Sequence, residues 1–250
     1  MIRKLFVNFP LEWFLMLFYT INMKKTTIIA GKDFPAGNTY SNIALENERD
    51  VIITTTPGVQ TDTSILKADS IAWNRSSPIS ARTVMMKAEN KYKKLDELLL
   101  IFDGPFFAAQ YVSNDIEGFS RTIDDLILGY CYLAAEAAAK YEKQGFGRLV
   151  FILKYTGTGA NPIKSAADLH PASIPLAIAQ DAFIALAENF AARFEASKQV
   201  FTTLVRADTN TDNETASWLF PFLSEIQVRR TSGWLKVGTK PGGVFSFLKN

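Results

Sequence analysis

The sequence is poor in the two residue types that most often hold transition metals or form covalent cross-links. It contains one cysteine, Cys131, and one histidine, His170, in 250 residues. A single cysteine cannot form an intrachain disulfide and is typical of a reducing compartment, so we expect a cytoplasmic protein. A zinc site of histidine and cysteine needs three or four such ligands, so we expect no bound metal.

An excess of charge of one sign is also absent. The 27 lysines and arginines nearly balance the 25 aspartates and glutamates, which leaves a formal net charge of +2. Basic side chains do not gather in any one stretch, so we expect no nucleic-acid partner. With 48% hydrophobic and 21% charged residues, the composition is that of a globular protein with a sizeable core.

The first 22 residues are apolar and aromatic but contain no run long enough to cross a membrane. Three residues interrupt them: Asn8, Pro10 and Glu12. The longest uninterrupted run, 13–19, is far shorter than the roughly 20 residues of a membrane-spanning helix, so we expect no membrane span. A signal peptide would need a cleavage site of small residues, which is missing. We interpret residues 1–22 as an extension before a start at Met23; a weak amphipathic anchor on a membrane surface is the alternative.

From Met23 onward, short β-branched runs alternate with segments that have helical spacing. The predicted strands are 26–30, 51–56, 70–74, 98–102, 149–153, 200–205 and 234–238. The predicted helices are 38–47, 79–94, 119–143 and 174–197. Continuous apolar strands separated by helices are typical of a parallel sheet covered on both faces. We therefore predict one α/β domain over 23–250, a Rossmann-like doubly wound parallel sheet of six to seven strands.

Two of the predicted helices are more apolar than a single buried stripe requires. The helix at 119–143 carries small and apolar residues at helical spacing: Ile123, Ile127, Tyr130, Ala134 and Ala138. The helix at 174–197 is rich in alanine. Such helices are buried under the sheet or against another subunit. Both readings stay open, and we expect a homo-oligomer formed through these two helices.

The order of these pieces resembles the short-chain dehydrogenase/reductase family over nearly all of 23–250. That family places a glycine, three residues, a glycine, one residue and a glycine after its first strand. Here the segment 31–37 reads GKDFPAG, with Pro35 in place of the middle glycine. IFDG at 101–104 stands where the family has Asn-Asn-Ala-Gly, and Asn74 stands near the position that contacts adenine. The glycine pattern alone is weakly specific, so the resemblance rests on order and spacing.

The resemblance implies a dinucleotide site with an altered loop. The implied contact residues are Gly31, Lys32, Phe34, Gly37, Asn74 and Gly104. Pro35 has no N–H to donate to a phosphate, and Asp33 would repel a 2′-phosphate, whereas Lys32 could pair with a phosphate. We therefore expect weak or no cofactor affinity, with NAD favoured over NADP.

The family's catalytic residues have no counterpart at the aligned positions. Members of the family use a tyrosine, a lysine four residues later, a serine on strand five and a helix asparagine. In this chain Leu176 and Gln180 stand at the tyrosine and lysine positions. The serine position falls on Leu153 or Lys154, and the asparagine position falls near Asp125 or Leu126. No tyrosine follows Tyr155, so the catalytic set is absent.

A rearranged set of residues is the other reading of this region. Tyr155 follows strand five, and His170 lies in the loop that comes next. Neighbouring residues on a strand point to opposite sides, so Lys154 is poorly placed to tune Tyr155. A lone loop histidine is usually only solvated. We interpret Asp103, at the end of strand four, as a turn or helix-cap residue.

These observations leave two hypotheses for the function. Only about two dozen residues (208–232) separate the last two strands, and we expect a loop and one short helix around 218–226 there. Such a short segment would close the site poorly to water, which disfavours hydride transfer. The first hypothesis is a non-catalytic binding, regulatory or scaffold protein. The alternative is an NAD(P)-dependent oxidoreductase that acts on a carbonyl or alcohol through a rearranged site.

Overall fold

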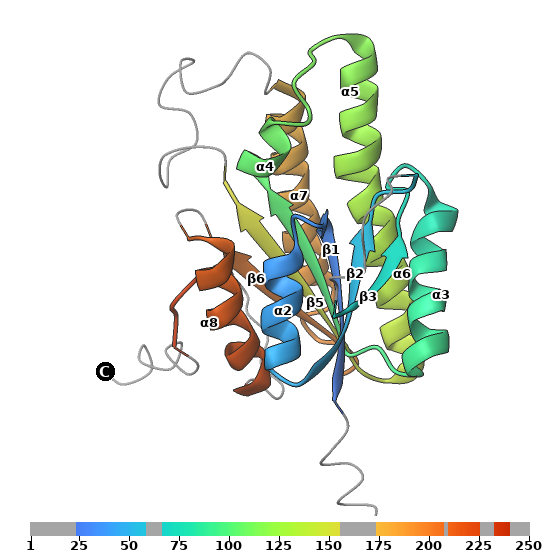
Figure 1. Cartoon of the computed structure of the whole chain (residues 1–250), viewed down its shortest axis with the longest axis vertical. Coiled ribbons are helices and arrows are strands. Elements are labelled where there is room, and N and C mark those ends of the chain that lie inside the picture. The colour runs from blue at the N-terminus through green and yellow to red at the C-terminus, as the bar shows by residue number, and fades with distance from the viewer. Residues whose placement is uncertain (1–23, 59–66, 156–173, 208–209, 226–232, 241–250) are drawn as a thin grey trace, which may run out of the picture.

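The described residues of the protein form one parallel sheet of seven strands in the order β3-β2-β1-β4-β5-β6-β7, as predicted (Figure 1). The computed structural model describes residues 24–58, 67–155, 174–207, 210–225 and 233–240. The strands are β1 (Lys25–Phe34), β2 (Arg49–Thr55), β3 (Asp69–Ala72), β4 (Glu97–Asp103), β5 (Gly147–Lys154), β6 (Val200–Arg206) and β7 (Leu235–Lys236). Every neighbouring pair is parallel, so the carboxyl ends of all the strands lie at one edge of the sheet.

Helices cover both faces of this sheet, which is the doubly wound arrangement. They are α2 (Asn38–Glu46), α3 (Pro78–Tyr92), α4 (Gly104–Ala108), α5 (Ile116–Ile123), α6 (Gly129–Gln144), α7 (Ile174–Arg193) and α8 (Asp212–Glu225). A π-helical turn, η2 (Asp124–Leu128), joins α5 to α6 in one continuous helix. This helix begins where the Asp115 carboxylate accepts the Gly118 N–H and ends at Gly145, whose φ is 86°. Such a left-handed glycine is a common helix terminator.

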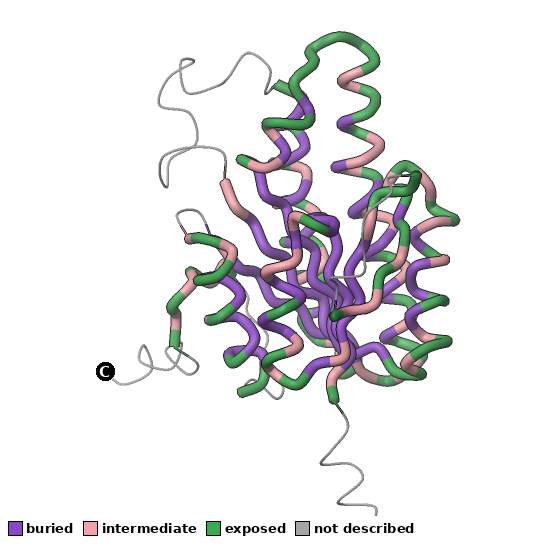
Figure 2. The backbone as a smooth tube through the Cα atoms, in the orientation of Figure 1, coloured by how far each residue is buried: buried purple, intermediate pink, exposed green. Residues whose placement is uncertain are grey.

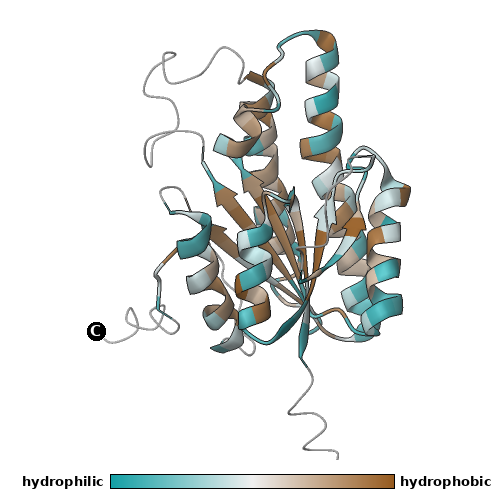
Figure 3. Ribbon diagram, in the orientation of Figure 1, coloured by the Kyte–Doolittle hydropathy of each residue, from teal (hydrophilic) through white to brown (hydrophobic). Residues whose placement is uncertain are grey.

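Alternating residues of the central strands fill two separate apolar cores. Ile28 and Leu100 pack on one face under α3, α6 and α7, whereas Ile29 and Ile101 pack on the other under α2 and α8. This alternation follows from the two-residue period of a strand. Figure 2 shows the resulting buried centre, and Figure 3 shows that the strands are its most hydrophobic part.

By length and composition alone, α7 is apolar enough to cross a membrane, with a mean hydropathy of 1.2. Its Leu176, Phe183 and Ala187 side chains are nevertheless buried in the core under the sheet. A helix packed in a protein core has these same properties, and we interpret α7 as a core helix.

A cluster of charges, all buried except the partly exposed Lys25, holds α8 at the amino ends of the strands. This amino-end cluster consists of Lys25, Arg49, Glu97 and Arg148. Glu97 lies 3.0 Å from Arg49 Nε and 3.6 Å from Lys25 Nζ. The cations also donate to α8: Arg49 to Phe220 O at 3.1 Å, and both Lys25 and Arg148 to Leu223 O, at 3.1 and 3.3 Å. Leu223 O lies in the last turn, where carbonyls lack helical partners, so the cluster satisfies the end of the helix.

Glu97 remains charged in this environment. Burial alone would raise the pKa of Glu97, but the neighbouring Arg49 and Lys25 outweigh it and lower that pKa below its ordinary value. The Glu97 carboxylate is therefore the shared counter-charge of three cations. These cations also donate hydrogen bonds to carbonyls of α8.

Three predicted element boundaries are wrong. β1 continues to Phe34, so Gly31, Lys32 and Asp33 lie in a strand and not in a loop. α8 begins at Asp212 and not near 218, because Thr211 and Glu214 cap it: each backbone N–H donates to the side chain of the other, at 2.7 and 3.2 Å. α7 ends at Arg193 and not at 197. The five-residue α4 has no counterpart among the predicted helices.

Candidate functional site

The candidate site lies at the carboxyl ends of β1 and β4, the neighbouring strands from which the chain winds outward in opposite directions. Open α/β sheets bind their ligands at such a switch point. Four charged side chains meet there: Lys32 from β1, Asp103 from β4, Lys154 from β5 and Asp212 from α8. We call these four residues the carboxyl-end cluster.

Lys32 is the centre of the carboxyl-end cluster. Its ammonium lies 2.6 Å from Asp103 Oδ2 and also bonds to Asp212. Lys154 Nζ lies farther away, 3.9 Å from Asp103 Oδ2 and 3.7 Å from Asp212 Oδ1. Burial alone would lower the pKa of Lys32, but the hydrogen bonds to Asp103 and Asp212 outweigh it and raise that pKa. Lys32 is thus charged, and the carboxylates of Asp103 and Asp212 from the same chain balance its charge.

The turn between β1 and α2 uses its own amide groups. The N–H groups of Gly37, Asn38 and Tyr40 donate to the carbonyls of Asp33, Pro35 and Gly37, at 3.2, 3.1 and 3.0 Å. A phosphate at a helix start relies on these amides. The first turn of α2 therefore offers few donors to an anion. Pro35 lies in the turn and not in the first helical turn.

The two glycines of the predicted loop are close to parts of the chain itself. Gly31 has a φ of +99°, and a Cβ there would lie 2.3 Å from Ile101 O and 2.5 Å from Tyr130 Oη. At Gly37 a Cβ would lie 2.0 Å from Lys32 O. Neither position accepts a side chain, so internal packing is sufficient to explain both glycines.

Arg75 pairs with Asp33, which is not exposed at the turn. Its guanidinium lies 2.9 Å from Asp33 Oδ2, donates to Gly31 O at 2.7 Å, and stacks on Trp73 and Phe107. The predicted preference for NAD over NADP depended on the negative charge of Asp33, and this pairing removes that reason. The preference stays a prediction.

The other predicted contact residues have different surroundings. Phe34 is buried in the core under α2 and α8. Asn74 is exposed, and its Oδ1 accepts from the Ser76 N–H at 3.3 Å in a local turn. Gly104 is buried at the start of α4. Asp103 caps that helix by accepting the Phe106 N–H at 3.1 Å, which confirms the interpretation of Asp103 as a cap.

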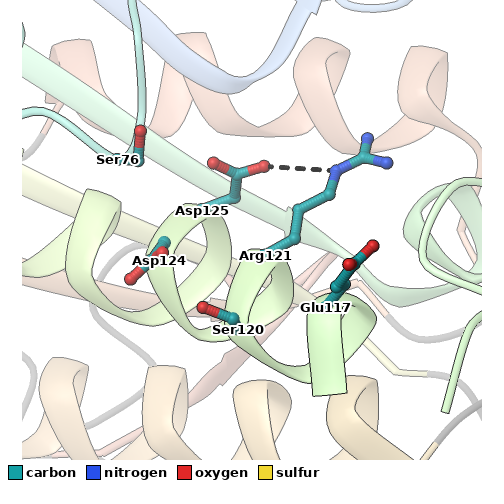
Figure 4. Close-up of a pocket in the computed structure, with 6 residues that line it drawn as sticks. All are labelled: Ser76, Glu117, Ser120, Arg121, Asp124 and Asp125. Carbon is teal, nitrogen blue, oxygen red and sulfur yellow. Dashed lines mark ion pairs between the residues drawn. The ribbon is translucent and has the colours of Figure 1, made fainter. Parts of the chain in front are cut away.

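A polar pocket of about 350 Å³ lies beside α5 and η2 (Figure 4). Its lining residues are Ser76, Glu117, Ser120, Arg121, Asp124 and Asp125. Tyr111 donates to Asp125 at 3.0 Å, and burial, together with Asp125, raises the pKa of Tyr111 to about 12. Three carboxylates and one guanidinium make the pocket unfavourable for a phosphate, and it includes none of the predicted contact residues.

Comparison with known proteins identifies the fold. No family model matches the sequence. An uncharacterized protein of Treponema pallidum (strain Nichols) is 27% identical over 174 residues, which cover 68% of this chain and 73% of that protein. Among solved structures, ElxO with NADP bound has a TM-score of 0.65 at 17% identity and covers 86% of this chain and 97% of its own. A metagenomic short-chain oxidoreductase in complex with NADP has a TM-score of 0.66 at 13% identity, with 86% and 98% covered. A short chain dehydrogenase from Mycobacterium smegmatis has a TM-score of 0.62 at 14% identity, with 87% and 93% covered.

The chain has the short-chain dehydrogenase/reductase fold. The interpretation of the sequence aligns α7 with the helix that carries the family's catalytic tyrosine and lysine, and it places Leu176 and Gln180 at those two positions. Both side chains are buried. Neither side chain exchanges a proton near neutral pH, and the alignment of these two positions stays a prediction.

The expected serine position falls on Leu153 or Lys154, and the expected asparagine position falls near Asp125 or Leu126. Leu153 and Leu126 are buried, whereas the two charged alternatives take part in ion pairs. Lys154, at the end of β5, belongs to the carboxyl-end cluster. Asp125 lies in the π-helical turn η2, a kind of turn that is frequent at functional sites, and it faces Arg121 at 3.8 Å.

The residues of the rearranged set are only partly described. Tyr155 is half-buried, and the Arg206 guanidinium lies 5.1 Å from the centre of its ring. Lys154 points to the two carboxylates of the carboxyl-end cluster, as expected if it does not tune Tyr155. His170 lies outside the described residues. Within the described parts of the chain, no group of three or more histidine, cysteine, aspartate or glutamate side chains is arranged to hold a metal ion.

Sequence reasoning missed Asp212 and Arg75. Each is distant in sequence from the residues that it contacts, 180 positions for Asp212 and Lys32 and 42 for Arg75 and Asp33. The one local signal for Asp212 is the Thr211-x-x-Glu214 capping pattern, which places Asp212 at the start of a helix.

Proposed function

We propose that the chain is a non-catalytic protein with the short-chain dehydrogenase/reductase fold, that it has a binding, regulatory or scaffolding role, and that its affinity for NAD(P)(H) is weak or absent. The observation that carries this proposal is the position of Lys32 between Asp103 and Asp212. Dinucleotide folds bind their ligand at this edge of the sheet. Here the protein's own carboxylates already pair with Lys32, the cation that a phosphate would need.

The residues at the catalytic positions support the same conclusion. Leu176 and Gln180 cannot replace a tyrosine whose pKa is lowered by a neighbouring lysine. An assay of ketone reduction and alcohol oxidation with NAD, NADH, NADP and NADPH tests the proposal. We expect no turnover above the rate without protein; turnover on any substrate of the panel would refute it.

We also propose a cytoplasmic homo-oligomer that associates through the helices at 119–143 and 174–197. Large apolar side chains on these helices remain exposed in the single chain: Ile123, Leu128, Ile174 and Ile178 are 36% to 51% exposed. Exposed apolar side chains on adjacent helices favour association with a second copy. Analytical ultracentrifugation tests this, and a monomer at micromolar concentration would contradict it.

The alternative is an NAD(P)-dependent oxidoreductase with a rearranged site. It is favoured by the two NADP-bound structures, each of which covers 86% of this chain. Tyr155, at the carboxyl end of β5, is then the candidate proton donor. Any turnover in the panel would be measured again with Tyr155→Phe, and loss of that turnover with an unchanged melting temperature would favour the alternative.

A further inference from the structure

The two carboxylates of the carboxyl-end cluster differ in how firmly the fold holds them. The Asp103 side chain is 4% exposed, lies at the end of β4 and caps α4. The Asp212 side chain is 20% exposed and belongs to α8, a separate element. Asp103 is thus a fixed, buried part of the site, whereas the Asp212 side chain is partly exposed to solvent.

The start of α8 does not depend on the Asp212 carboxylate. The Thr211 and Glu214 side chains cap the helix through reciprocal bonds to each other's backbone N–H. The far end of α8 is held by Lys25, Arg49 and Arg148. The Asp212 carboxylate pairs with the ammonium groups of Lys32 and Lys154. Its principal contacts are therefore those that an anionic ligand would make.

Without Asp212, two ammonium groups would share the single carboxylate of Asp103. Both ammoniums lie at the switch point of the sheet, where ligands of open α/β folds bind. A phosphate oxygen bonded to an ammonium forms a strong charge-assisted hydrogen bond, and a divalent anion can engage both lysines. Lys154 is 22% exposed and lies 3.7 Å or more from both carboxylates, so its donors are not all satisfied by them.

We propose that Lys32 and Lys154 form an anion-binding site for the phosphate group of a ligand, and that the Asp212 carboxylate occupies this site from within. The proposal deepens the proposed function and rests on it, because it explains weak dinucleotide affinity by an internal competitor. Helix α8 then acts as the element that closes the site, and removal of one negative charge opens it.

Isothermal titration calorimetry with inorganic pyrophosphate, ADP and NADH tests this proposal on the full chain. Asp212→Asn removes the competing charge and keeps the shape of the side chain. We expect it to bind pyrophosphate about tenfold or more tightly than the unmodified protein. Asp50→Asn is the matched control, because it makes the same change of net charge on β2, near the opposite edge of the sheet, and we expect it to match the unmodified protein.

A second pair of variants separates a specific site from a general charge effect. Lys32→Met combined with Asp212→Asn, and Lys154→Met combined with Asp212→Asn, should each lose most of the gain. A gain with pyrophosphate alone supports a phosphate-anion site, and a larger gain with ADP or NADH supports a nucleotide ligand at that site. If Asp212→Asn is not folded by circular dichroism, Asp212→Ser is tested in the same way.

The result that overturns the proposal is a folded Asp212 variant that binds none of the three probes more tightly than the unmodified protein. This outcome is distinct from a failure of the proposed function. The proposed function fails if the unmodified protein itself turns over substrate or binds a dinucleotide tightly, whereas the present proposal depends on the ratio between variant and unmodified protein.

Discussion

The two ends of the sheet each carry a cluster of charges, and the two clusters have different roles. At the amino ends, three cations surround Glu97, whose side chain is 2% exposed, and donate their remaining hydrogen bonds to α8 carbonyls. At the carboxyl ends, two lysines face two aspartates, and one of those aspartates is partly exposed. Both clusters bind the same helix, α8, at its opposite ends.

The difference lies in what satisfies the cations. Backbone carbonyls at the amino ends cannot be replaced by a ligand unless α8 moves away from the cations, so this cluster is structural. A side-chain carboxylate at the carboxyl ends can be replaced by another anion with little change in the backbone. Position relative to the strand ends therefore separates a cluster that stabilises the fold from one that forms a candidate site.

The largest expected effect on stability is at the amino ends. Glu97→Gln leaves Lys25, Arg49 and Arg148 without a carboxylate, and we expect the free energy of unfolding in urea to fall by about 3–5 kcal/mol. Glu142→Gln, on the exposed side of α6, should change it by no more than about 0.5 kcal/mol. Equal effects of the two substitutions would contradict a structural role for the amino-end cluster.

The stabilisation by Glu97 should also depend on pH. Its pKa is lowered from the ordinary value of 4.5 in the folded protein, so the unfolded chain takes up this proton at a higher pH than the folded one. The stability advantage of the unmodified protein over Glu97→Gln is therefore complete above pH 4.5 and decreases as the pH falls through the folded-state pKa. Urea titrations between neutral and acidic pH measure this difference.

Gly31→Ala comes next, because it tests how tightly the carboxyl end of β1 is packed. An added Cβ meets Ile101 O and Tyr130 Oη in a left-handed backbone conformation. We expect a loss of about 2–4 kcal/mol, from backbone strain and overpacking together. Gly145→Ala, with a φ of +86° and nothing within 4 Å, should cost only about 1–2 kcal/mol. The difference between the two variants measures the close approach of Ile101 O and Tyr130 Oη.

Lys32→Met should cost less than Glu97→Gln, about 1–3 kcal/mol, because Lys154 remains beside both carboxylates. The pKa of Lys32 is raised above its ordinary value of 10.5. The stabilisation by Lys32 is therefore complete below pH 10.5 and is lost as the pH rises through the folded-state pKa. Thermal melts of both proteins up to alkaline pH measure it; a constant difference in stability across that range would contradict the pairing.

The smallest of these effects concerns the start of α8. Thr211→Ala removes one side of the reciprocal cap with Glu214, and we expect a loss of about 1 kcal/mol. Thr211→Ser keeps the hydroxyl and should restore most of this stability. If Thr211→Ala has no effect while Asp212→Asn destabilises strongly, Asp212 and not the cap sets the start of α8.

The arrangement of strands and helices could be predicted from the sequence because it depends on local periodicity. Apolar runs such as 98–102 and 149–153 identify buried strands, and alternation with helices fixes a parallel sheet. The extension of β1 to Phe34 could not be predicted, because Gly31 and Pro35 are both typical of a turn. Long-range bonds from Arg75 to Gly31 O and Asp33 hold this irregular end of the strand.

Only the location of the candidate site, and not its charge pairing, could be predicted from the sequence. The segment 31–37 follows the predicted strand 26–30, which places it at the carboxyl-end edge of the sheet where the candidate site lies. The pairing of Lys32 with Asp103 and Asp212 joins three segments that are far apart in sequence, and no local pattern reports such a contact. Such long-range charge pairs can be identified only from the folded structure, in which the segments lie together.

The central claim is that the protein's own charges occupy the edge of the sheet where this fold binds a dinucleotide. A thermal-shift titration of the unmodified protein with NAD, NADH, NADP and NADPH tests it most directly, since any ligand that binds the folded state raises its melting temperature. We expect no increase in melting temperature at micromolar concentrations of any of the four. A clear increase with micromolar NADH or NADPH would contradict the claim.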